Sequence, residues 1–407
     1  MMNLVNSRFD KDYTKFQMIY FLFVSGFGFF FPYFNVYLEQ NLGFSGSQIG
    51  GVISISLLMS VAISPLWGSL SDKSGNYKLL LKILLIAYAV IAWLLFNQTA
   101  YFMVVIFATL MEMVGIGMSP MLDVLAVDYC ERMKKDFGRL RIAASVGWIF
   151  GSYTAGFLIT TLMMDVSYAV FWPLIIFMII SAVIAFYLPS PQVKDVKKSD
   201  EPTDKPSIKL LLKNKPFIFL MVFNFLTLSL IDSVVAFAGN HLVLTLDASP
   251  SAIGWMNVIA VTPEIIFFLF ATKLMQRIGY KKFYIFAVVT LILRFIVYAT
   301  TSNVVLFLAA GIVGPIMMAP AVIGNFLYIK KHVQANLTGT AFILNVAILT
   351  LGRALFSLIF GVIYDMFGSF MLFKFSIAFF VIALIILLPT KHFDVFNETA
   401  DLEHDFK

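Results

Sequence analysis

Apolar stretches of about 20 residues alternate with short polar segments along almost the whole chain. A helix of about 20 apolar residues crosses a hydrocarbon layer roughly 30 Å thick. Backbone groups in lipid must bond within their own segment, and runs this long favour helices over barrel strands. The pattern predicts twelve membrane-spanning helices, at residues 16–38, 48–70, 79–96, 101–127, 140–163, 168–188, 217–242, 251–275, 283–300, 304–329, 338–366 and 370–389.

The basic residues between these spans predict the orientation of the chain. Alternate connections, such as "EQNLGFSGS" and "VLTLDASP", contain no lysine or arginine, whereas "DKSGNYKLLLK", "ERMKKDFGR" and the 189–216 segment are rich in them. Cytoplasmic loops carry the excess of lysine and arginine, so both termini and the central segment are predicted to be cytoplasmic. The net charge of +6 is then a topology signal, and we expect no nucleic-acid partner.

Composition agrees with a multi-pass membrane protein and argues against a soluble one. Of the 407 residues, 60% are hydrophobic and 13% are charged, and the mean hydropathy is +0.90. Cys130 is the one cysteine, and we find no metal-ligand spacing, nucleophile–base arrangement or phosphate loop in the sequence. We therefore expect no enzyme activity, no cofactor and no bound metal. The expected location is the plasma membrane of a bacterium, with lipid around a monomer.

A polar segment divides the spans six and six. The predicted parts are an N-terminal bundle at 1–188, a linker at 189–216, a C-terminal bundle at 217–390 and a tail at 391–407. The two halves echo each other, because "SLSDKSGNYK" follows the second span and "KLMQRIGYKK" follows the eighth. Two parallel six-helix repeats are the layout of the major facilitator transporters, whose substrate site lies between the halves.

The loop after the second span, "GSLSDKSGNYK", resembles the major facilitator loop signature G-x-L-x-D-x-x-G-x-x-K. Gly68 would permit close helix approach and Gly75 a tight turn. Asp72 would accept hydrogen bonds at a neighbouring helix end, and Lys78 completes the signature. These four residues are our predicted gating residues.

Charged residues inside membrane spans are costly and usually face a cavity or a partner. Seven of those inside the spans stand out: Glu112, Asp123, Arg141, Asp232, Glu264, Arg294 and Arg353. Asp123 and Arg141 lie at similar depth in consecutive antiparallel spans, so they are expected to pair and to offer forked donors to a polar ligand. Trp148 follows Arg141 by seven residues and shares its helix face. A carboxylate, a guanidinium and an indole suit a sugar, which has hydroxyls around a ring with one apolar face.

The chain also resembles the lactose permease branch of the major facilitators, the oligosaccharide/proton symporters. The likeness runs through "FFFPYFNVYLEQ", "PLWGSLSDKSGNYK" and "DVLAVDYCERMKKDFGRLRIAASVGW", and through "LILRFIVYATTS" in the C-terminal half. It implies a galactoside-type site at Asp123, Arg141 and Trp148, with Asp123 where the family has glutamate. Arg294 matches an arginine linked to proton movement. The related nucleoside symporters and phenylpropionate-permease-like transporters share the fold and the span-five arginine, but usually have phenylalanine in place of Trp148.

The C-terminal half departs from that family. Its tenth span, "GIVGPIMMAPAVIGNF", lacks the histidine and glutamate that the lactose permease family uses for proton coupling. Glu264 with Arg294 is our candidate for a relocated proton site. Asp232 and Arg353 are read as a structural pair between helices. Glu112 either binds substrate or bonds a neighbouring helix, and the sequence does not decide between these.

The sequence thus predicts a secondary transporter for proton-coupled uptake of an oligosaccharide or glycoside by alternating access. The alternatives are symport of a nucleoside or aromatic acid, and then efflux, lipid flipping or sugar sensing without transport. The sequence does not identify the sugar, the proton stoichiometry or the carboxylate that carries the proton.

Overall fold

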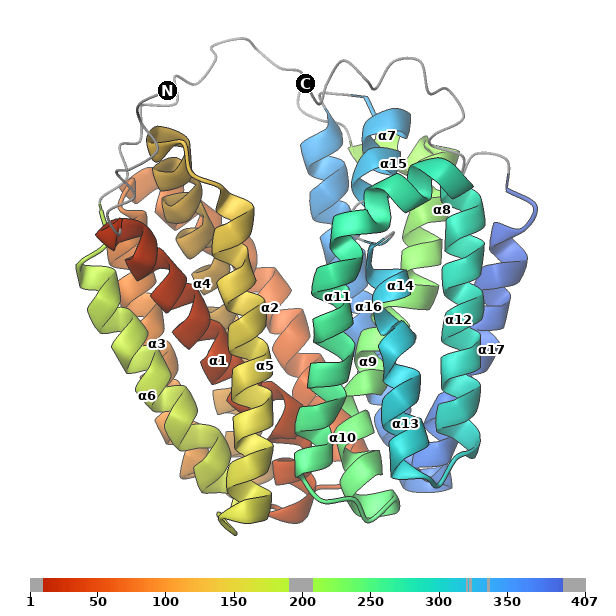
Figure 1. Ribbon diagram of the computed structural model, residues 1–407, viewed down its shortest axis with the longest axis horizontal. Coiled ribbons are helices and arrows are strands. Elements are labelled where there is room, and N and C mark those ends of the chain that lie inside the picture. Colours follow the sequence, from red (N-terminus) through yellow and green to blue (C-terminus); the bar gives the residue numbers. More distant parts are fainter. Residues whose placement is uncertain (1–9, 190–207, 320, 322–323, 335–336, 391–407) are drawn as a thin grey trace, which may run out of the picture. The chain divides into compact units, whose positions relative to one another are not determined.

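The computed structural model describes residues 10–189, 208–319, 321, 324–334 and 337–390, and the regular elements in these ranges are helical (Figure 1). The prediction of an all-helical membrane protein is confirmed. Most of the predicted linker at 189–216 and all of the predicted tail at 391–407 lie outside the described residues. The chain forms two compact units, and the residues 249–258 belong to the first although they follow the linker. The predicted division into 1–188 and 217–390 stays a prediction.

The first unit is built from six long helices. They are α1 (Lys11–Gln40), α2 (Gly46–Ser74), α3 (Tyr77–Phe96), α4 (Tyr101–Met133), α5 (Phe137–Thr161) and α6 (Val166–Phe186). α1 packs along α5 and α6, while α2 and α3 pack against α4, and α3 also contacts α6. α1 is therefore the central helix of this unit, and it is lined with buried aromatic side chains such as Phe16, Tyr20 and Phe30.

Short polar side chains lie at the start of several of these helices. Asp10, Asp136 and Asp165 each accept backbone N–H groups in the first turn of α1, α5 and α6. Such caps satisfy donors that have no partner inside the helix. Ser45 forms a capping box at the start of α2. Gly75 ends α2 with a φ of 60°, a left-handed conformation that glycine adopts without a steric penalty.

The second unit has more broken helices. Its elements are α7 (Ile208–Lys213), α8 (Lys215–Asn224), η1 (Phe225–Ser229), α9 (Leu230–Ala236), α10 (Ala238–Asn240), η2 (His241–Thr245), the greater part of α11 (Ser251–Ile278), α12 (Tyr280–Thr300), α13 (Val304–Ala310), η3 (Gly311–Val313), α14 (Gly314–Ala319), α15 (Asn325–His332), α16 (Thr338–Phe367) and α17 (Ser369–Leu387). η1 is a π-helical turn within the predicted seventh span, η2 is a π-helical turn at the end of that span, and η3 is a 3₁₀ turn. α16 packs against α9, η1 and α17, and α12 packs against α17.

The predicted tenth span is interrupted. Within 304–329 the described residues form α13, η3, α14 and the beginning of α15 instead of one helix. The sequence explains the break, because Gly311 and Gly314 are poor helix formers and Pro315 removes a backbone donor. Ten helices among the described residues are long and apolar enough to cross a membrane, or eleven if the bent α11 counts as one span. Twelve spans and cytoplasmic termini stay predictions.

Many large apolar side chains lie on the outer faces of the helices. Ile83 is 53% exposed, Trp93 49% and Ile385 60%. Soluble proteins rarely leave such extended apolar surfaces open to water. The exposed faces are suited to lipid, as expected for a protein that crosses the membrane several times.

Candidate functional site

Asp123 on α4 and Arg141 on α5 form an ion pair in the first unit. Nη1 of Arg141 lies 2.9 Å from Oδ1 and 3.0 Å from Oδ2 of Asp123. The side chain of Arg141 is 49% exposed and that of Asp123 is 33% exposed. One carboxylate and one guanidinium make the pair neutral overall. Its exposed surface leaves room for a polar ligand to donate and accept hydrogen bonds.

Tyr20 on α1 is a third member of this cluster that the sequence analysis missed. Its hydroxyl donates a hydrogen bond to Oδ1 of Asp123, and its side chain is almost completely buried. The Arg141 guanidinium carbon also lies 5.9 Å from the centre of the Tyr20 ring. A tyrosine in an aromatic-rich helix gives no distinct sequence signal, so only the structure identifies it. The hydrogen bond from Tyr20 fixes the orientation of the Asp123 carboxylate.

Trp148 lies on α5, as the sequence predicted, and is partly buried. Its indole Nε1 donates a hydrogen bond of 2.9 Å to Oδ1 of Asn257. Nδ2 of Asn257 in turn donates to the carbonyl of Ile253 at 2.9 Å. Asn257 and Ile253 belong to the part of α11 that clusters with the first unit. The indole is thereby held in one orientation by a side chain that lies more than 100 residues away in the sequence.

Glycines bring α5 very close to α1 and so position Arg141 and Trp148. A Cβ atom on Gly151 would lie 2.2 Å from the Ser25 carbonyl oxygen, and one on Gly147 would lie 2.4 Å from that of Phe21. Both distances are far below normal contact, so these two positions accept no side chain at the present helix separation. Small residues are the usual means of close helix packing in membranes.

Glu112 and the predicted gating residues lie elsewhere in the first unit. Glu112 is partly buried on α4, eleven residues before Asp123. Nζ of Lys78 donates to the carbonyl of Leu188, just beyond α6. A Cβ on Gly68 would meet no described atom within 4 Å, so the close helix approach expected there is not seen in this unit. The side chain of Asp72 lies outside the described residues. Gating by these residues stays a prediction.

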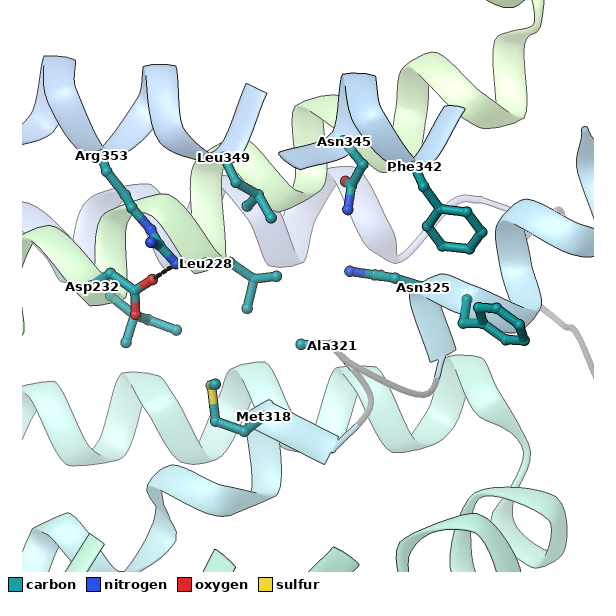
Figure 2. A pocket seen from close by; sticks show the side chains of 11 residues that line it. Leu228, Asp232, Met318, Ala321, Asn325, Phe342, Asn345, Leu349 and Arg353 are labelled. Atoms are coloured by element: carbon teal, nitrogen blue, oxygen red, sulfur yellow. Dashed lines mark ion pairs between the residues drawn. The ribbon is translucent and has the colours of Figure 1, made fainter. Parts of the chain in front are cut away.

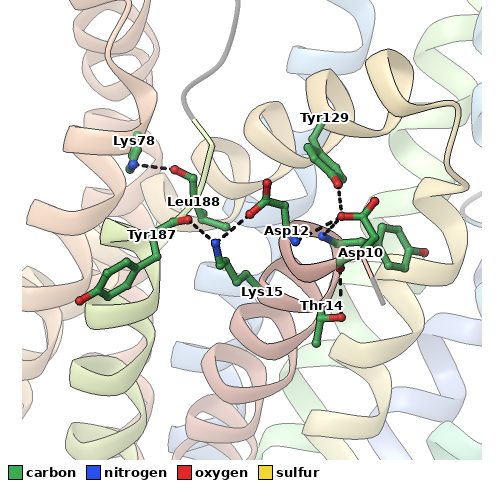
Figure 3. Close-up of polar contacts among 9 residues, drawn as sticks. Asp10, Asp12, Thr14, Lys15, Lys78, Tyr129, Tyr187 and Leu188 are labelled. Atoms are coloured by element: carbon green, nitrogen blue, oxygen red, sulfur yellow. Dashed lines mark hydrogen bonds and ion pairs between the residues drawn. The ribbon is translucent and has the colours of Figure 1, made fainter. Parts of the chain in front are cut away.

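A polar network at one end of the first unit was also missed by the sequence analysis (Figure 3). The Tyr129 hydroxyl on α4 donates to Oδ1 of Asp10, the N-cap of α1. Nζ of Lys15 bonds both Asp12, at 2.8 Å, and the carbonyl of Tyr187, at 3.0 Å. Together with the Lys78 contact, these bonds tie the ends of α1, α3, α4 and α6 together.

Burial raises the pKa of Asp10, but several donors outweigh this effect. The Tyr129 hydroxyl, the backbone N–H groups of Tyr13 and Asp12 and the charge of Lys135 stabilise the carboxylate and leave its pKa below the usual value. The ionised form of Asp10 therefore stabilises the folded state.

In the second unit, the structure does not join Glu264 to Arg294 by an ion pair among the residues it describes. Arg294 is 6% exposed, and its Nε and Nη2 donate to the hydroxyl of Tyr298, one turn further along α12, at 3.0 and 2.9 Å. A Cβ on Gly314 would lie 2.8 Å from Nη1 of Arg294. Glu264 is partly buried on α11. The assignment of proton coupling to these two residues stays a prediction.

Asp232 on α9 and Arg353 on α16 are joined by an ion pair between Oδ2 and Nη2 (Figure 2). The Ser233 hydroxyl donates to the backbone carbonyl of Arg353 at 3.0 Å and ties the same two helices together. The pair lines a cavity of about 270 Å³ within the second unit. The sequence predicted a structural role for this pair and gave no indication of the cavity. Across the described residues, no cluster of three or more histidine, cysteine, aspartate or glutamate side chains could hold a metal ion.

Comparisons with known proteins place these features in a family. The chain matches the model of the MFS_1 like family over residues 13–375. It is 25% identical to the maltose permease of Geobacillus stearothermophilus over 286 residues, which cover 70% of this chain and 71% of that protein. It is 27% identical over 274 residues to the "Putative nucleoside transporter YegT" of Escherichia coli (strain K12). That match covers 64% of this chain and 62% of YegT.

The fold has solved counterparts. The crystal structure of the nucleoside transporter NupG has a TM-score of 0.81 with this chain at 17% identity, and the match covers 92% of this chain and 98% of NupG. These relatives confirm the predicted resemblance to sugar and nucleoside transporters of the major facilitator type. The relatives are transporters, not enzymes. The chain belongs to the MFS_1 like family and is a multi-pass transporter of the cell membrane with the major facilitator fold.

Proposed function

We propose that this transporter takes up an oligosaccharide or glycoside together with protons, by alternating access. The observation that carries the proposal is the partly exposed Asp123–Arg141 pair, fixed by Tyr20 and followed on the same helix by Trp148. The similarity to a maltose permease supports a sugar as the substrate. Twelve spans with both termini and the linker in the cytoplasm are part of this proposal.

Each residue of the site has a separate role in the proposed binding. Asp123 accepts hydrogen bonds from sugar hydroxyls, and Arg141 donates to their oxygens through N–H groups that Asp123 does not use. Trp148 offers a flat apolar surface to the C–H face of the ring. The hydrogen bond from Trp148 to Asn257 fixes the plane of this surface before the sugar arrives, which lowers the entropy lost on binding. Glu112, on the same helix as Asp123, is proposed to contact a longer substrate.

Proton coupling is proposed to use Glu264, with Arg294 as a fixed positive charge in the same unit. Arg294 is held in place by Tyr298 whether or not Glu264 is ionised. In the proposed cycle, protonation from outside and sugar binding permit closure of the outer side. Opening to the cytoplasm then releases the sugar before the proton.

Two assays on purified protein in liposomes test the substrate and the coupling separately. Counterflow of labelled maltose requires no proton gradient and reports the substrate, whereas a pH-sensitive dye trapped in the lumen reports coupling. We expect maltose counterflow, and acidification of the lumen when maltose is added outside.

The outcomes of the two assays are distinct. Counterflow without acidification would refute the proton coupling, while uridine counterflow without maltose counterflow would refute the sugar and favour a nucleoside. The absence of any sugar counterflow, together with proton flux that does not depend on sugar, would refute symport of a sugar altogether.

A further inference from the structure

The cavity in the second unit has four polar side chains on otherwise apolar walls (Figure 2). These side chains are Asp232, Arg353, Asn325 and Asn345, and they come from α9, α16 and α15. The other walls are leucine, isoleucine, alanine, methionine and phenylalanine side chains. A small number of placed polar groups in a mostly apolar hollow is the usual composition of a small-molecule site.

The charged pair in the cavity is neutral overall and remains accessible. The side chains of Arg353 and Asp232 are 41% and 38% exposed, although Arg353 lies in the middle of the long helix α16 and Asp232 lies in the first turn of α9. Burying an ion pair costs desolvation free energy, which is recovered only when further hydrogen bonds satisfy both side chains. This pair instead presents part of the guanidinium and part of the carboxylate to the cavity.

The two asparagines are fixed so that both present donors. The Tyr284 hydroxyl donates to Oδ1 of Asn325 at 3.1 Å, and Nδ2 of Asn224 donates to Oδ1 of Asn345 at 2.8 Å. Asn325 is 5% exposed and Asn345 7%. Because the amide oxygens are engaged away from the cavity, the Nδ2 groups of both face it, as Figure 2 shows. Two amide donors suit a ligand whose oxygen atoms accept hydrogen bonds.

A local irregularity of the backbone precedes Asp232 and lies beside Gly352, the residue before Arg353. Leu228, which lines the cavity, belongs to the π-helical turn η1, and Asp232 follows in α9. A Cβ on Gly352 would lie 2.5 Å from Oγ of Ser229 in the same turn, so α16 approaches η1 closely only because this residue is glycine. Arg353 is the next residue. Single π-helical turns in helices are frequent at functional sites.

We propose that this cavity binds a neutral, oxygen-bearing part of the transported molecule, such as the hydroxyls of a sugar ring, and discriminates against carboxylates. Two amide groups and the guanidinium donate to ligand oxygens, while Asp232 accepts from ligand hydroxyls. Asp232 is already paired with Arg353, which among the described residues is the one cationic side chain that lines the cavity. An anionic ligand would therefore compete with Asp232 for Arg353. The proposal rests on the proposed function only in taking the ligand to be the transported solute.

The first test measures the binding of maltose and uridine to the full chain in detergent by titration calorimetry. Asn345→Leu and Asn325→Leu each remove one donor from the cavity, and we expect at least a tenfold weaker Kd for the neutral ligand that the wild type binds. Ser376→Ala is the matched control, because its buried hydroxyl donates to the carbonyl of Leu372 in α17 and Ser376 does not line the cavity. It should leave the Kd unchanged.

The second test uses 3-phenylpropionate as an anionic probe. Asp232→Asn keeps the size of the side chain but leaves Arg353 uncompensated, so the variant should bind this carboxylate at least tenfold more tightly than the wild type does. Asp128→Asn is the control, because it frees Arg132 from an ion pair at the end of α4, far along the chain from the cavity. It should give no such gain. This test does not depend on the substitution of either asparagine.

The outcomes separate this proposal from the proposed function. If Arg141→Ala abolishes maltose binding while both asparagine variants keep a Kd within twofold of the wild type, the sugar function stands and the cavity proposal is wrong. If uridine binds, maltose does not, and the asparagine variants weaken uridine binding, the cavity proposal stands and the sugar is wrong. The cavity proposal is also overturned if the wild type binds neither neutral ligand, or if Asp232→Asn gains no affinity for 3-phenylpropionate.

Discussion

Substitution of Gly151 by alanine is expected to disturb both the stability and the ligand site of the first unit. The added Cβ would lie 2.2 Å from the Ser25 carbonyl oxygen and 2.9 Å from the Phe29 backbone nitrogen. Both are backbone atoms of α1, so no side chain can rotate to make room. A carbon and an oxygen need about 3.2 Å or more, and α5 must therefore move from α1 by roughly 1 Å.

The size of the effect follows from this displacement. Overpacking of a tight interface costs about 1–3 kcal/mol, and each 1 kcal/mol lowers Tm by roughly 2–4 °C in a domain of about 200 residues. We expect Tm to fall by about 2–12 °C in a thermal scan of the detergent-solubilised protein. Maltose affinity should fall as well, because Asp123 is bonded both by Tyr20 on α1 and by Arg141 on α5. Moving α5 away from α1 would disturb this arrangement.

Gly339→Ala is the control for this substitution. Gly339 lies in the first turn of α16, and an added Cβ would meet no described atom within 4 Å. Alanine favours a helix over glycine by about 1 kcal/mol, so this variant should match or exceed the stability of the wild type. A Gly151→Ala variant with an unchanged Tm and an unchanged maltose Kd would refute the close α1–α5 packing.

Three further predictions follow from the first unit. Asp10→Asn should lower the free energy of unfolding by about 0.5–1 kcal/mol at pH 7, because the pKa of Asp10 is lower in the folded chain than in the unfolded chain, where it is near 4. This contribution is present above the unfolded-state pKa and is lost as the pH falls through the folded-state pKa. Thermal scans from pH 7 to pH 3 should show the difference between variant and wild type shrinking, and a constant difference would contradict the assignment. Asp123→Asn should weaken maltose binding by about tenfold or more, since charged hydrogen bonds contribute roughly 1.5–3 kcal/mol; a calorimetric Kd equal to that of the wild type would exclude Asp123 from the site. Trp148→Phe removes the hydrogen bond to Asn257 and should weaken maltose by several-fold in counterflow, whereas unchanged maltose transport would count against stacking on the indole.

The elements that could be predicted from the sequence are those that depend on local composition. Long apolar runs identify spans directly, because each must satisfy its own backbone in lipid. The approach of Asp123 and Arg141 could also be expected, since two lone charges at similar depth in consecutive spans are costly apart. The broken tenth span was not predicted, although Gly311, Gly314 and Pro315 carry the signal for it. The apolar run concealed these breaks.

Contacts between distant residues could not be read from the sequence. Tyr20 and Asn257 are ordinary residues of apolar helices, and only packing brings them to Asp123 and Trp148. Arg294 was expected near an acid but bonds Tyr298, a phenol one turn along its own helix. The donors at Asn325 and Asn345 face the cavity only because other side chains engage their oxygens.

The most direct test of the account compares two arginines on one helix. Arg141 pairs with Asp123 in the candidate site. Arg139 lies outside the site: its side chain is 80% exposed, and its Nε is 3.7 Å from Oδ2 of Asp136. Maltose counterflow in liposomes should be lost, or its apparent affinity reduced by at least tenfold, in Arg141→Ala and should be retained in Arg139→Ala. Full maltose counterflow by Arg141→Ala, with the affinity of the wild type, would contradict the proposal that the Asp123–Arg141 pair binds the sugar.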